Sequence, residues 1–295
     1  MDDPLSHWLR LREPADHAAR SEALTRSIAG ALPSGKPLSV LDLGTGTGSN
    51  VRYLAERLPG RQRWLAVDRS AALLAELPGR ISSWGAARGY ETRTEPGRCI
   101  IRGVHFECDV ETRQMDLGTL DDREIFAGRD IVTASALLDL VSEPWLRALA
   151  AHCRAEGVAA LFAITYNGRF SCTPVEAEDN DVRDLMNRHQ KRDKGWGGRA
   201  AGPDADACAE RCFAEAGYQV RREPSDWTLG PAEGDVQRLL IDGWAEAATE
   251  MAPDRAATIA SWRARRLAHV AAGRSRIVVG HGDLAAWPAY AQAPR

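Results

Sequence analysis

The chain reads Leu41-Asp42-Leu43-Gly44-Thr45-Gly46-Thr47-Gly48 where a short apolar run gives way to three alternating glycines. Glycine permits positive φ and lets a ligand approach the backbone without a Cβ in the way. A glycine loop that leads from a strand into the N-terminus of a helix is therefore suited to cradle a nucleotide-like ligand. We expect this loop to form such a cradle.

Short apolar runs alternate with helix-like segments along most of the chain. The predicted strands are 39–43, 63–68, 104–109, 130–134, 158–165, 218–220 and 276–279. The predicted helices between them are 50–58, 71–77, 144–155 and 205–216. This alternation predicts an α/β fold with a doubly wound sheet, whose ligand crevice lies at the C-terminal ends of the strands.

Two segments depart from this alternation. The chain up to Ala31 is mostly helical in pattern, and Glu233 to Ala272 has apolar residues at helical spacing before the last predicted strand. We interpret residues 1–36 as an N-terminal helical cap. Residues 37–295 are then one domain, with added segments at 166–204 and 231–274 and a helical insertion before the last strand.

Two carboxylates stand at informative places around the glycine loop. Asp42 lies inside an otherwise apolar strand, and a buried carboxylate needs a donor such as an ammonium group or backbone N–H groups. Asp68 ends the second predicted strand, where an acid hydrogen-bonds ribose hydroxyls in folds of this kind.

With these residues in view, the chain resembles the class I S-adenosylmethionine-dependent methyltransferases of the Rossmann-like, small-molecule type. The family's first motif, an acid followed by Gly-x-Gly-x-Gly, matches Asp42 with Gly44, Gly46 and Gly48. The resemblance covers roughly residues 37–220 and the closing strand near Val278. It implies a mostly parallel seven-stranded sheet whose last strand is antiparallel.

The resemblance also implies a cofactor site for S-adenosyl-L-methionine, with S-adenosyl-L-homocysteine as product. Its second and third motifs match Asp68 and, after the third strand, Asp109 with Val110 beside it, facing adenine. The residues implied at this site are Asp42, Gly44, Thr45, Gly46, Gly48, Asp68, Arg69, Asp109, Val110, Ala134, Ser135 and Arg20. By this resemblance, Ala134 or Ser135 would lie near the sulfonium. Arg20 meets the methionine carboxylate or, alternatively, pairs on the surface with Asp16.

The main rival is a nicotinamide-dependent dehydrogenase, whose fingerprint is Gly-x-Gly-x-x-Gly. Counted from Gly44 and from Gly46, the third glycine falls on Ser49 and Val51. The rival also places a pyrophosphate near Asp42, where two further negative charges are unfavourable. A third interpretation is a degenerate fold that binds no cofactor, which leaves the glycines and acids coincidental.

The acceptor side is expected after the fourth and fifth strands. We consider His189, Tyr166 and Asp139 as catalytic, with His189 best suited to take a proton near neutral pH. Asp139 is alternatively a helix cap and Tyr166 a packing residue. Asn167, Asp193 and Trp196 are the expected substrate-binding residues. The last two belong to the polar stretch 187–198, either a lid over the acceptor or an exposed connection.

The composition limits the partners. Of the 295 residues, 44% are hydrophobic and 27% charged, with a net charge of −3, which gives no general attraction to nucleic acid or anionic membranes. The N-terminus lacks the features of a signal peptide and no stretch is apolar enough to span a membrane. The six cysteines show no CxxC pair, so we expect no metal and a reduced, cytoplasmic protein.

We therefore expect an enzyme, a transferase that methylates a small molecule at an N, O or C atom by in-line displacement. The oligomeric state and the acceptor are open. The alternatives are an RNA- or protein-modifying methyltransferase and a non-catalytic cofactor-binding protein on the same fold. The macromolecule-modifying enzyme needs a basic face, which the charge balance does not favour. Only an activity assay distinguishes the non-catalytic protein from an enzyme.

Overall fold

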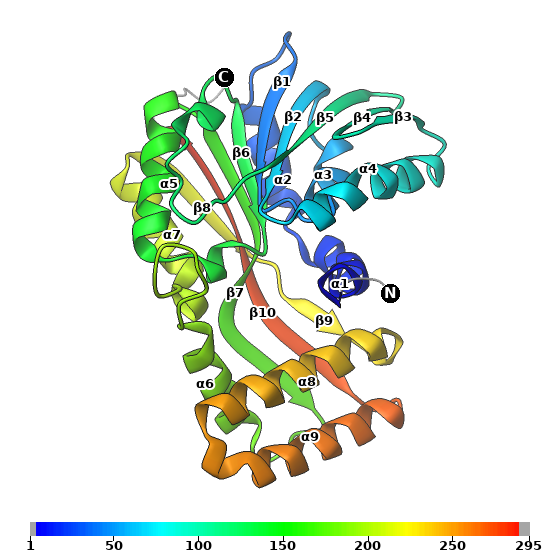
Figure 1. The fold of residues 1–295 in the computed structure, drawn as a ribbon, viewed down its shortest axis with the longest axis vertical. Helices are drawn as coiled ribbons and strands as arrows, with labels where there is room; N and C mark the ends of the chain where they lie inside the picture. The colour runs from blue at the N-terminus through cyan, green and yellow to red at the C-terminus, as the bar shows by residue number, and fades with distance from the viewer. Residues whose placement is uncertain (1–3, 289–295) are drawn as a thin grey trace.

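Residues 4–288 are described by a computed structural model, and their strands join into one ten-stranded sheet (Figure 1). The elements along the chain are α1 (Pro4–Ala19), α2 (Glu22–Ala31), β1 (Leu38–Leu43), α3 (Ser49–Ala55), β2 (Gly60–Asp68), α4 (Ala71–Ala86), β3 (Glu91–Glu95), β4 (Arg98–Arg102), β5 (Phe106–Gln114), β6 (Ile131–Ser135), the short turn η2 (Leu138–Leu140), α5 (Glu143–Glu156), β7 (Ala159–Thr173), α6 (Asp179–Gln190), α7 (Ala205–Glu215), β8 (Tyr218–Pro224), β9 (Trp227–Leu229), α8 (Gly234–Met251), α9 (Ala256–Ala271) and β10 (Arg276–Pro288).

The strand order is β3-β4-β5-β2-β1-β6-β7-β10-β8, with β9 paired to β10. Neighbours from β5 to β7 are all parallel, whereas β10 runs antiparallel between β7 and β8. The predicted mostly parallel α/β sheet is therefore confirmed. The sheet has ten strands rather than the expected seven, because the β3–β4 hairpin extends the β5 edge and β9 pairs with β10.

Helices cover both faces of the parallel strands. On one face α2, α3 and α4 bury a cluster that includes Ile28, Leu54 and Ile81 against Val40 of β1. On the other face α5 and α7 bury a second cluster against Leu41 of β1. Because successive side chains of a strand point to opposite faces, this alternation fixes the register of β1 between the two layers.

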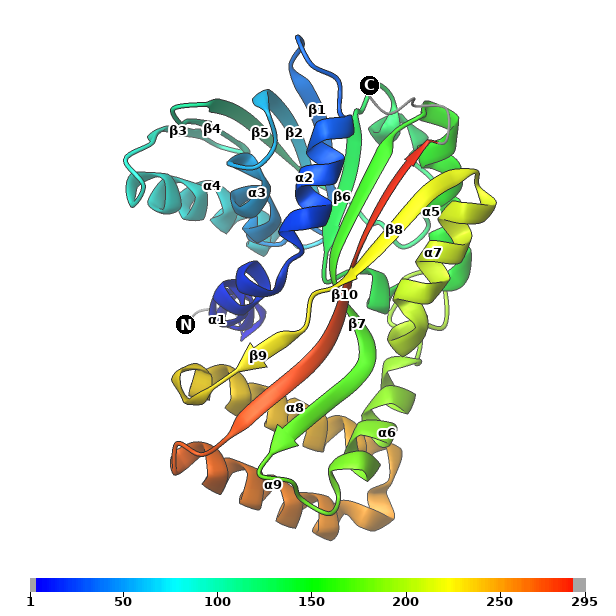
Figure 2. The same cartoon turned by 180° about the vertical axis from the view of Figure 1, so that it is seen from behind.

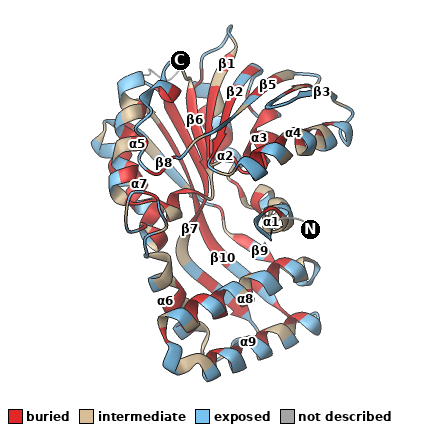
Figure 3. Cartoon of the chain, in the orientation of Figure 1, coloured by how far each residue is buried: buried red, intermediate tan, exposed pale blue. Residues whose placement is uncertain are grey.

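Two long strands carry a second lobe below the parallel sheet. β7 continues to Thr173, well past the predicted 158–165, and β10 pairs with it over most of its length. Their outer halves, together with α6, α8, α9 and β9, enclose a third apolar cluster. Figures 1 and 2 show α8 and α9 crossing below these strands, and Figure 3 shows exposed residues on the outer faces of both helices.

The two added segments differ in how well the pattern predicted them. The insertion before the last strand forms the two helices α8 and α9, as expected from its helical spacing. The segment 166–204 is less irregular than expected, since it begins within β7 and includes α6 up to Gln190. Among residues 4–288, no helix is long and apolar enough to cross a membrane.

Candidate functional site

The glycine loop connects β1 to α3 at the C-terminal end of the sheet. Gly44, Gly46 and Gly48 have φ of 63°, 54° and 82°, values at which a Cβ is strained. The N–H of Gly46 donates to Oδ2 of Asp68 over 2.8 Å, and the N–H of Ser70 donates to Oδ1 over 2.8 Å. Asp68 thus ties the turn after β2 to the glycine loop, and each of its oxygens keeps an acceptor position.

A cavity of about 180 Å³ lies over this loop, and we call it the loop cavity. Of the predicted cofactor residues, those that line it are Gly44, Thr45, Gly46, Asp68, Arg69 and Ser135. Gly48 stands behind them as the N-cap of α3. Ala134 is buried in the apolar cluster beneath α5, so its neighbour Ser135 is the one that reaches the cavity.

Behind the loop lies a buried cluster of polar side chains. Asn50 of α3 accepts from Nη1 of Arg20 over 2.5 Å, and its Nδ2 donates to Oδ1 of Asp42 over 2.7 Å. Arg20 also stacks on Tyr53, with 4.0 Å between the guanidinium carbon and the ring centre. The alternative of a surface pair between Arg20 and Asp16 is wrong, because Arg20 is buried and Asp16 pairs with Arg12 at 2.9 Å.

This cluster has unused hydrogen-bonding capacity. Nε and Nη2 of Arg20 and Oδ2 of Asp42 are buried and have no partner. Burial raises the pKa of Asp42 from 3.8 to about 6. Asn50 thus holds Arg20, with two free donors, on one side and Asp42, with one free acceptor, on the other. These groups complement the carboxylate and the ammonium of an α-amino acid.

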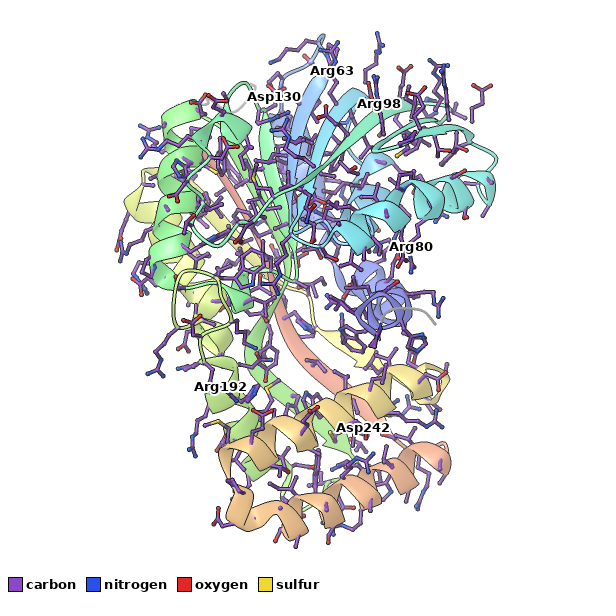
Figure 4. The ribbon with its side chains drawn as sticks, viewed as in Figure 1. Arg63, Arg80, Arg98, Asp130, Arg192 and Asp242 are labelled. Carbon is purple, nitrogen blue, oxygen red and sulfur yellow. The ribbon has the colours of Figure 1, made fainter. Side chains whose placement is uncertain are left out.

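The structure does not place Asp109 and Val110 at the loop cavity, where the resemblance assigned them to the adenine. β5 runs on to Gln114, so Asp109 lies in mid-strand opposite Arg63, whereas Gln114 is opposite Asp68. Five residues of strand separate these levels, about 16 Å. Asp109 instead pairs with Arg98, and Val110 packs under α4. Figure 4 shows Arg63 and Arg98 at the upper edge of the sheet, away from α1.

The chain after β5 lies beside the loop cavity, although Met115 and Leu117 do not line it. The N–H of Met115 donates to the carbonyl of Asp68 over 2.9 Å, and Trp145 Nε1 donates to the carbonyl of Leu117 over 2.6 Å. Trp196 packs edge-to-face on Trp145. The guanidinium carbon of Arg69 lies 5.1 Å from the centre of the Trp196 ring. Trp196 therefore lines the loop cavity rather than the acceptor region to which its position assigned it.

Helix α1 covers the glycine loop. Glu13 forms a pair with Arg52 of α3 at 2.6 Å, and Ser6 bonds Glu76 of α4 at 2.7 Å. These contacts place Leu9 so close to Gly46 that a Cβ there would be 3.2 Å from it. The predicted N-terminal helices are thus part of the wall of the site. Figure 4 shows Arg80, which also bonds Ser6, on α4 above α1.

A larger cavity of about 670 Å³ adjoins the first, and we call it the second cavity. It lies between α1, η2, the outer halves of β7 and β10, α6, β9 and α8. Its apolar wall is formed by Trp8, Met186, Trp227, Leu240, Trp244 and Val279. The two cavities share Leu5, Leu9, Arg12, Ala136 and Leu140.

All three predicted catalytic residues line the second cavity. Asp139 is buried on η2, and burial raises the pKa of its carboxyl group. It is not a helix cap, since Ser142 caps α5. Tyr166 donates its hydroxyl proton to Asn187 over 2.8 Å, and burial raises its pKa. Nε2 of His189 lies 3.2 Å from Glu250 of α8.

Two predicted substrate-binding residues lie outside the second cavity. Asn167 follows Tyr166 on β7 and therefore points to the opposite face, where Arg169 donates to it over 3.2 Å. Asp193 is exposed and accepts from the N–H of Gly195 over 2.8 Å, which makes it a turn residue. Neither is among the residues that line the cavity.

Backbone strain is concentrated at the second cavity. Among residues 4–288, three non-glycine residues have positive φ, and two of them, Ala136 at 53° and Ile164 at 54°, line this cavity. A β-branched residue such as Ile164 rarely adopts this conformation. Strained backbone persists where the surroundings enforce it, which is common at ligand sites.

Sequence reasoning missed Trp227 and His281, whereas Arg12 was expected only as one of the N-terminal residues that close over the cofactor. Arg12 lines both cavities, and Trp227 donates its Nε1 proton to Asp16 over 3.1 Å. Burial lowers the pKa of His281 to about 3, so the imidazole is neutral. No local signal marks these residues, because they meet only when β9, β10 and α1 come together.

No family model matches the chain, and no curated protein matches it in sequence. The chain is similar to the solved structure of the cyclopropane synthase MmaA2 from Mycobacterium tuberculosis, with 12% identity, 94% of this chain and 93% of that chain covered, and a TM-score of 0.46. A second similar structure is a SAM-dependent methyltransferase from Thiobacillus denitrificans in complex with S-adenosyl-L-homocysteine, with 14% identity, 98% and 100% covered, and a TM-score of 0.43. At these values the likeness assigns neither a substrate nor a residue role to this chain.

Proposed function

We propose that the protein transfers a methyl group from S-adenosylmethionine to a small molecule bound in the second cavity. The observation that carries this proposal is the set of unpartnered buried atoms on Arg20 and Asp42 behind the glycine loop. A carboxylate on Arg20 and an ammonium on Asp42 satisfy all of them at once. A pyrophosphate does not, because it offers no donor to Asp42.

The remaining cofactor contacts follow from the loop cavity. The glycine backbone between Gly44 and Gly46 would lie against the ligand, and the free lone pairs of Asp68 would accept from both ribose hydroxyls. In place of Asp109, we assign the adenine end to residues 115–117 and the indole of Trp196, which adjoin Asp68. Ser135 and Ala136 would then hold the reacting end of the cofactor, since Ser135 lines the loop cavity and Ala136 lines both cavities.

The cofactor supplies an already activated methyl group, so the protein's part is alignment and exclusion of water. Helix α1 closes over both cavities, and the apolar wall of the second cavity keeps water from the acceptor. If the acceptor atom loses a proton as its new bond to the methyl carbon forms, Asp139 is the group we assign to take it. Its carboxylate is buried at the cavity, whereas His189 is already engaged by Glu250.

A small acceptor is favoured over a macromolecule by the position of the second cavity. Residues of α1, α6, α8 and β10 all belong to its lining, so an acceptor bound there would contact the protein on several sides. The macromolecular and non-catalytic alternatives remain outcomes of an assay that follows labelled methyl transfer to RNA, protein and small-metabolite fractions.

The amino-acid end of the site gives the sharpest test. S-adenosylhomocysteine and 5′-methylthioadenosine share adenosine and sulfur, but only the first has the amino-acid group. We expect Arg20→Met to weaken S-adenosylhomocysteine binding by about 1.5–3 kcal/mol, the value of a hydrogen bond to a charged group. Calorimetry should show unchanged methylthioadenosine binding, which also reports that the variant is folded. Equal losses for both ligands, or no binding of either by the native protein, would contradict the proposal.

The base is tested separately. We expect Asp139→Asn to lower the turnover number by about 10²–10⁴-fold, the usual contribution of a positioned base, for an acceptor that must lose a proton. S-adenosylhomocysteine affinity should stay unchanged. His189→Ala is the matched comparison and should lower turnover less. A larger effect at His189 would transfer the role of base to the histidine.

A further inference from the structure

The second cavity carries an unbalanced set of charges. Of the described side chains that line it, Arg12 and Lys194 are the permanent cations and Asp139 is the one carboxylate. Asp139 forms no ion pair with either cation within 4.0 Å. His281 is neutral because it is buried, and the charge of Arg12 also opposes its protonation.

Within residues 4–288 Lys194 forms no direct ion pair, and the charge of the nearby Asp139 offsets only part of the effect of burial on its pKa. Lys194 lies in the loop after α6, its ammonium donates to the side-chain amide of Gln190, and burial lowers its pKa. Among residues 4–288, no carboxylate lies within 4.0 Å of its Nζ. A partly desolvated ammonium that bonds only a neutral amide is unfavourable unless an anion joins it.

Arg12 presents its free donors to the same cavity. Its Nε donates to Asp16 over 2.9 Å, and within residues 4–288 its two terminal nitrogens have no hydrogen-bond partner. Its guanidinium carbon lies 5.9 Å from the ring centre of Trp8 and 5.4 Å from that of Trp227. The indole faces that would attract a cationic acceptor therefore already hold a cation of the protein.

We propose that the acceptor is an amphipathic carboxylic acid. Its carboxylate would be held by Arg12 and Lys194, and its apolar body, the size of an aromatic ring system, would lie against Met186, Trp227 and Trp244. This inference rests on the proposed function for its role in catalysis, but carboxylate binding is measurable without turnover. A planar carboxylate suits the paired terminal nitrogens of Arg12 better than a single polar oxygen does.

The test uses acids and amides of equal size. Indole-3-propionate, 4-phenylbutyrate and octanoate are each compared with their primary amides by calorimetry, on the full-length protein saturated with S-adenosylhomocysteine. We expect at least one acid to bind about tenfold or more tightly than its amide, the effect of a charge-assisted hydrogen bond. Lys194→Met should remove this preference and leave amide binding unchanged.

Lys191→Met is the matched control. Lys191 lies in the same loop and the substitution changes the charge equally, but its Nζ pairs with Asp204 at 2.7 Å, away from the second cavity. It should keep the preference for acids.

Three outcomes overturn the inference: amides binding as tightly as acids, the matching amines binding better, or no acid binding at 5 mM. In those cases Arg12 and Lys194 only balance Asp139. Because cofactor binding is measured in the same samples, its absence would count against the proposed function instead.

Discussion

At the scale of single residues, the buried carboxylate of Asp42 both indicates where the site lies and determines how ligand binding there depends on pH. It was conspicuous in the sequence because an acid interrupts an apolar strand. The structure adds that Asn50 bonds one of its oxygens and leaves the other without a partner. Without a bound cation, burial favours its protonated form, which is why its pKa rises to about 6.

The pKa of Asp42 predicts how binding depends on pH. A bound ammonium requires the ionised carboxylate, so binding below pH 6 must first remove a proton from Asp42. We expect S-adenosylhomocysteine affinity to be constant above about pH 7 and to fall towards tenfold per pH unit below 6. Calorimetry between pH 5 and 8 measures this slope. Methylthioadenosine, which has no ammonium, and the variant Asp42→Asn should both lack it; the same slope in that variant would assign the titration to another group.

Residue-level prediction succeeded where the motif is local and failed where position depends on strand length. Asp42 and the glycines lie in or beside the turn after β1, and Asp68 lies at the turn after β2. Local chain geometry therefore sets their positions. Asp109 was misplaced because β5 continues for five residues beyond it, and the last four of these are polar or charged, which hides the true end of the strand. Trp196 was expected on the acceptor side but lines the loop cavity, because the loop after α6 folds back towards Arg69 and Trp145.

At the scale of elements, the turn from β1 to α3 depends on backbone that only glycine adopts easily. Gly46 and Gly35 both have positive φ, 54° and 81°, but nothing lies within 4 Å of a Cβ built at Gly35. The two glycines therefore separate the cost of backbone strain from the loss of a ligand contact.

We expect Gly46→Ala and Gly35→Ala to lose similar stability, about 1 kcal/mol each, because both put an L-residue into the left-handed region. Thermal unfolding measures this. S-adenosylhomocysteine binding should be weakened strongly in Gly46→Ala alone, because the added Cβ would lie 3.2 Å from Leu9 and both residues line the loop cavity. Equal affinity in the two variants would show that the loop is not the cradle.

Elements with strong periodicity were predictable, but their ends were not. The strands β1, β2 and β6 lie within a few residues of their predicted positions, because apolar runs there are short and bounded. The ends of β7 and β10 could not be located from sequence. The outer half of β7 alternates polar and apolar residues beyond the predicted 158–165, and β10 continues past the predicted 276–279 to Pro288, where it pairs with β7 and β8. The added segments 166–204 and 231–274 were therefore visible in the sequence, but their assembly into one lobe on β7 and β10 was not.

At the scale of the whole molecule, the loop cavity and the second cavity rest on different cores. The glycine loop is supported by the two clusters on either face of the parallel strands. Most of the apolar wall of the second cavity belongs to the third cluster, with Trp227, Trp244 and Val279. Damage to that cluster should therefore act on the acceptor more than on the cofactor.

Ile259 of α9 is buried in the third cluster and does not line either cavity. We expect Ile259→Ala to lower the free energy of unfolding by about 2–5 kcal/mol, through lost apolar contact and the space left behind. Urea denaturation measures this loss. Under native conditions the variant should bind S-adenosylhomocysteine normally, while its Michaelis constant for the acceptor rises. A matching loss of cofactor affinity would mean that the two lobes share one core.

Helix α1 supplies Leu5, Leu9 and Arg12 to the loop cavity and to the second cavity alike. A ligand in one cavity that fixes the position of α1 therefore also fixes part of the wall of the other cavity. Two ligands joined through a common wall obey thermodynamic reciprocity: the factor by which one tightens the binding of its neighbour is the factor it receives in return. An acceptor that binds best after S-adenosylmethionine must therefore also slow the dissociation of S-adenosylmethionine or speed its association. Release of the cofactor before methyl transfer then becomes rarer.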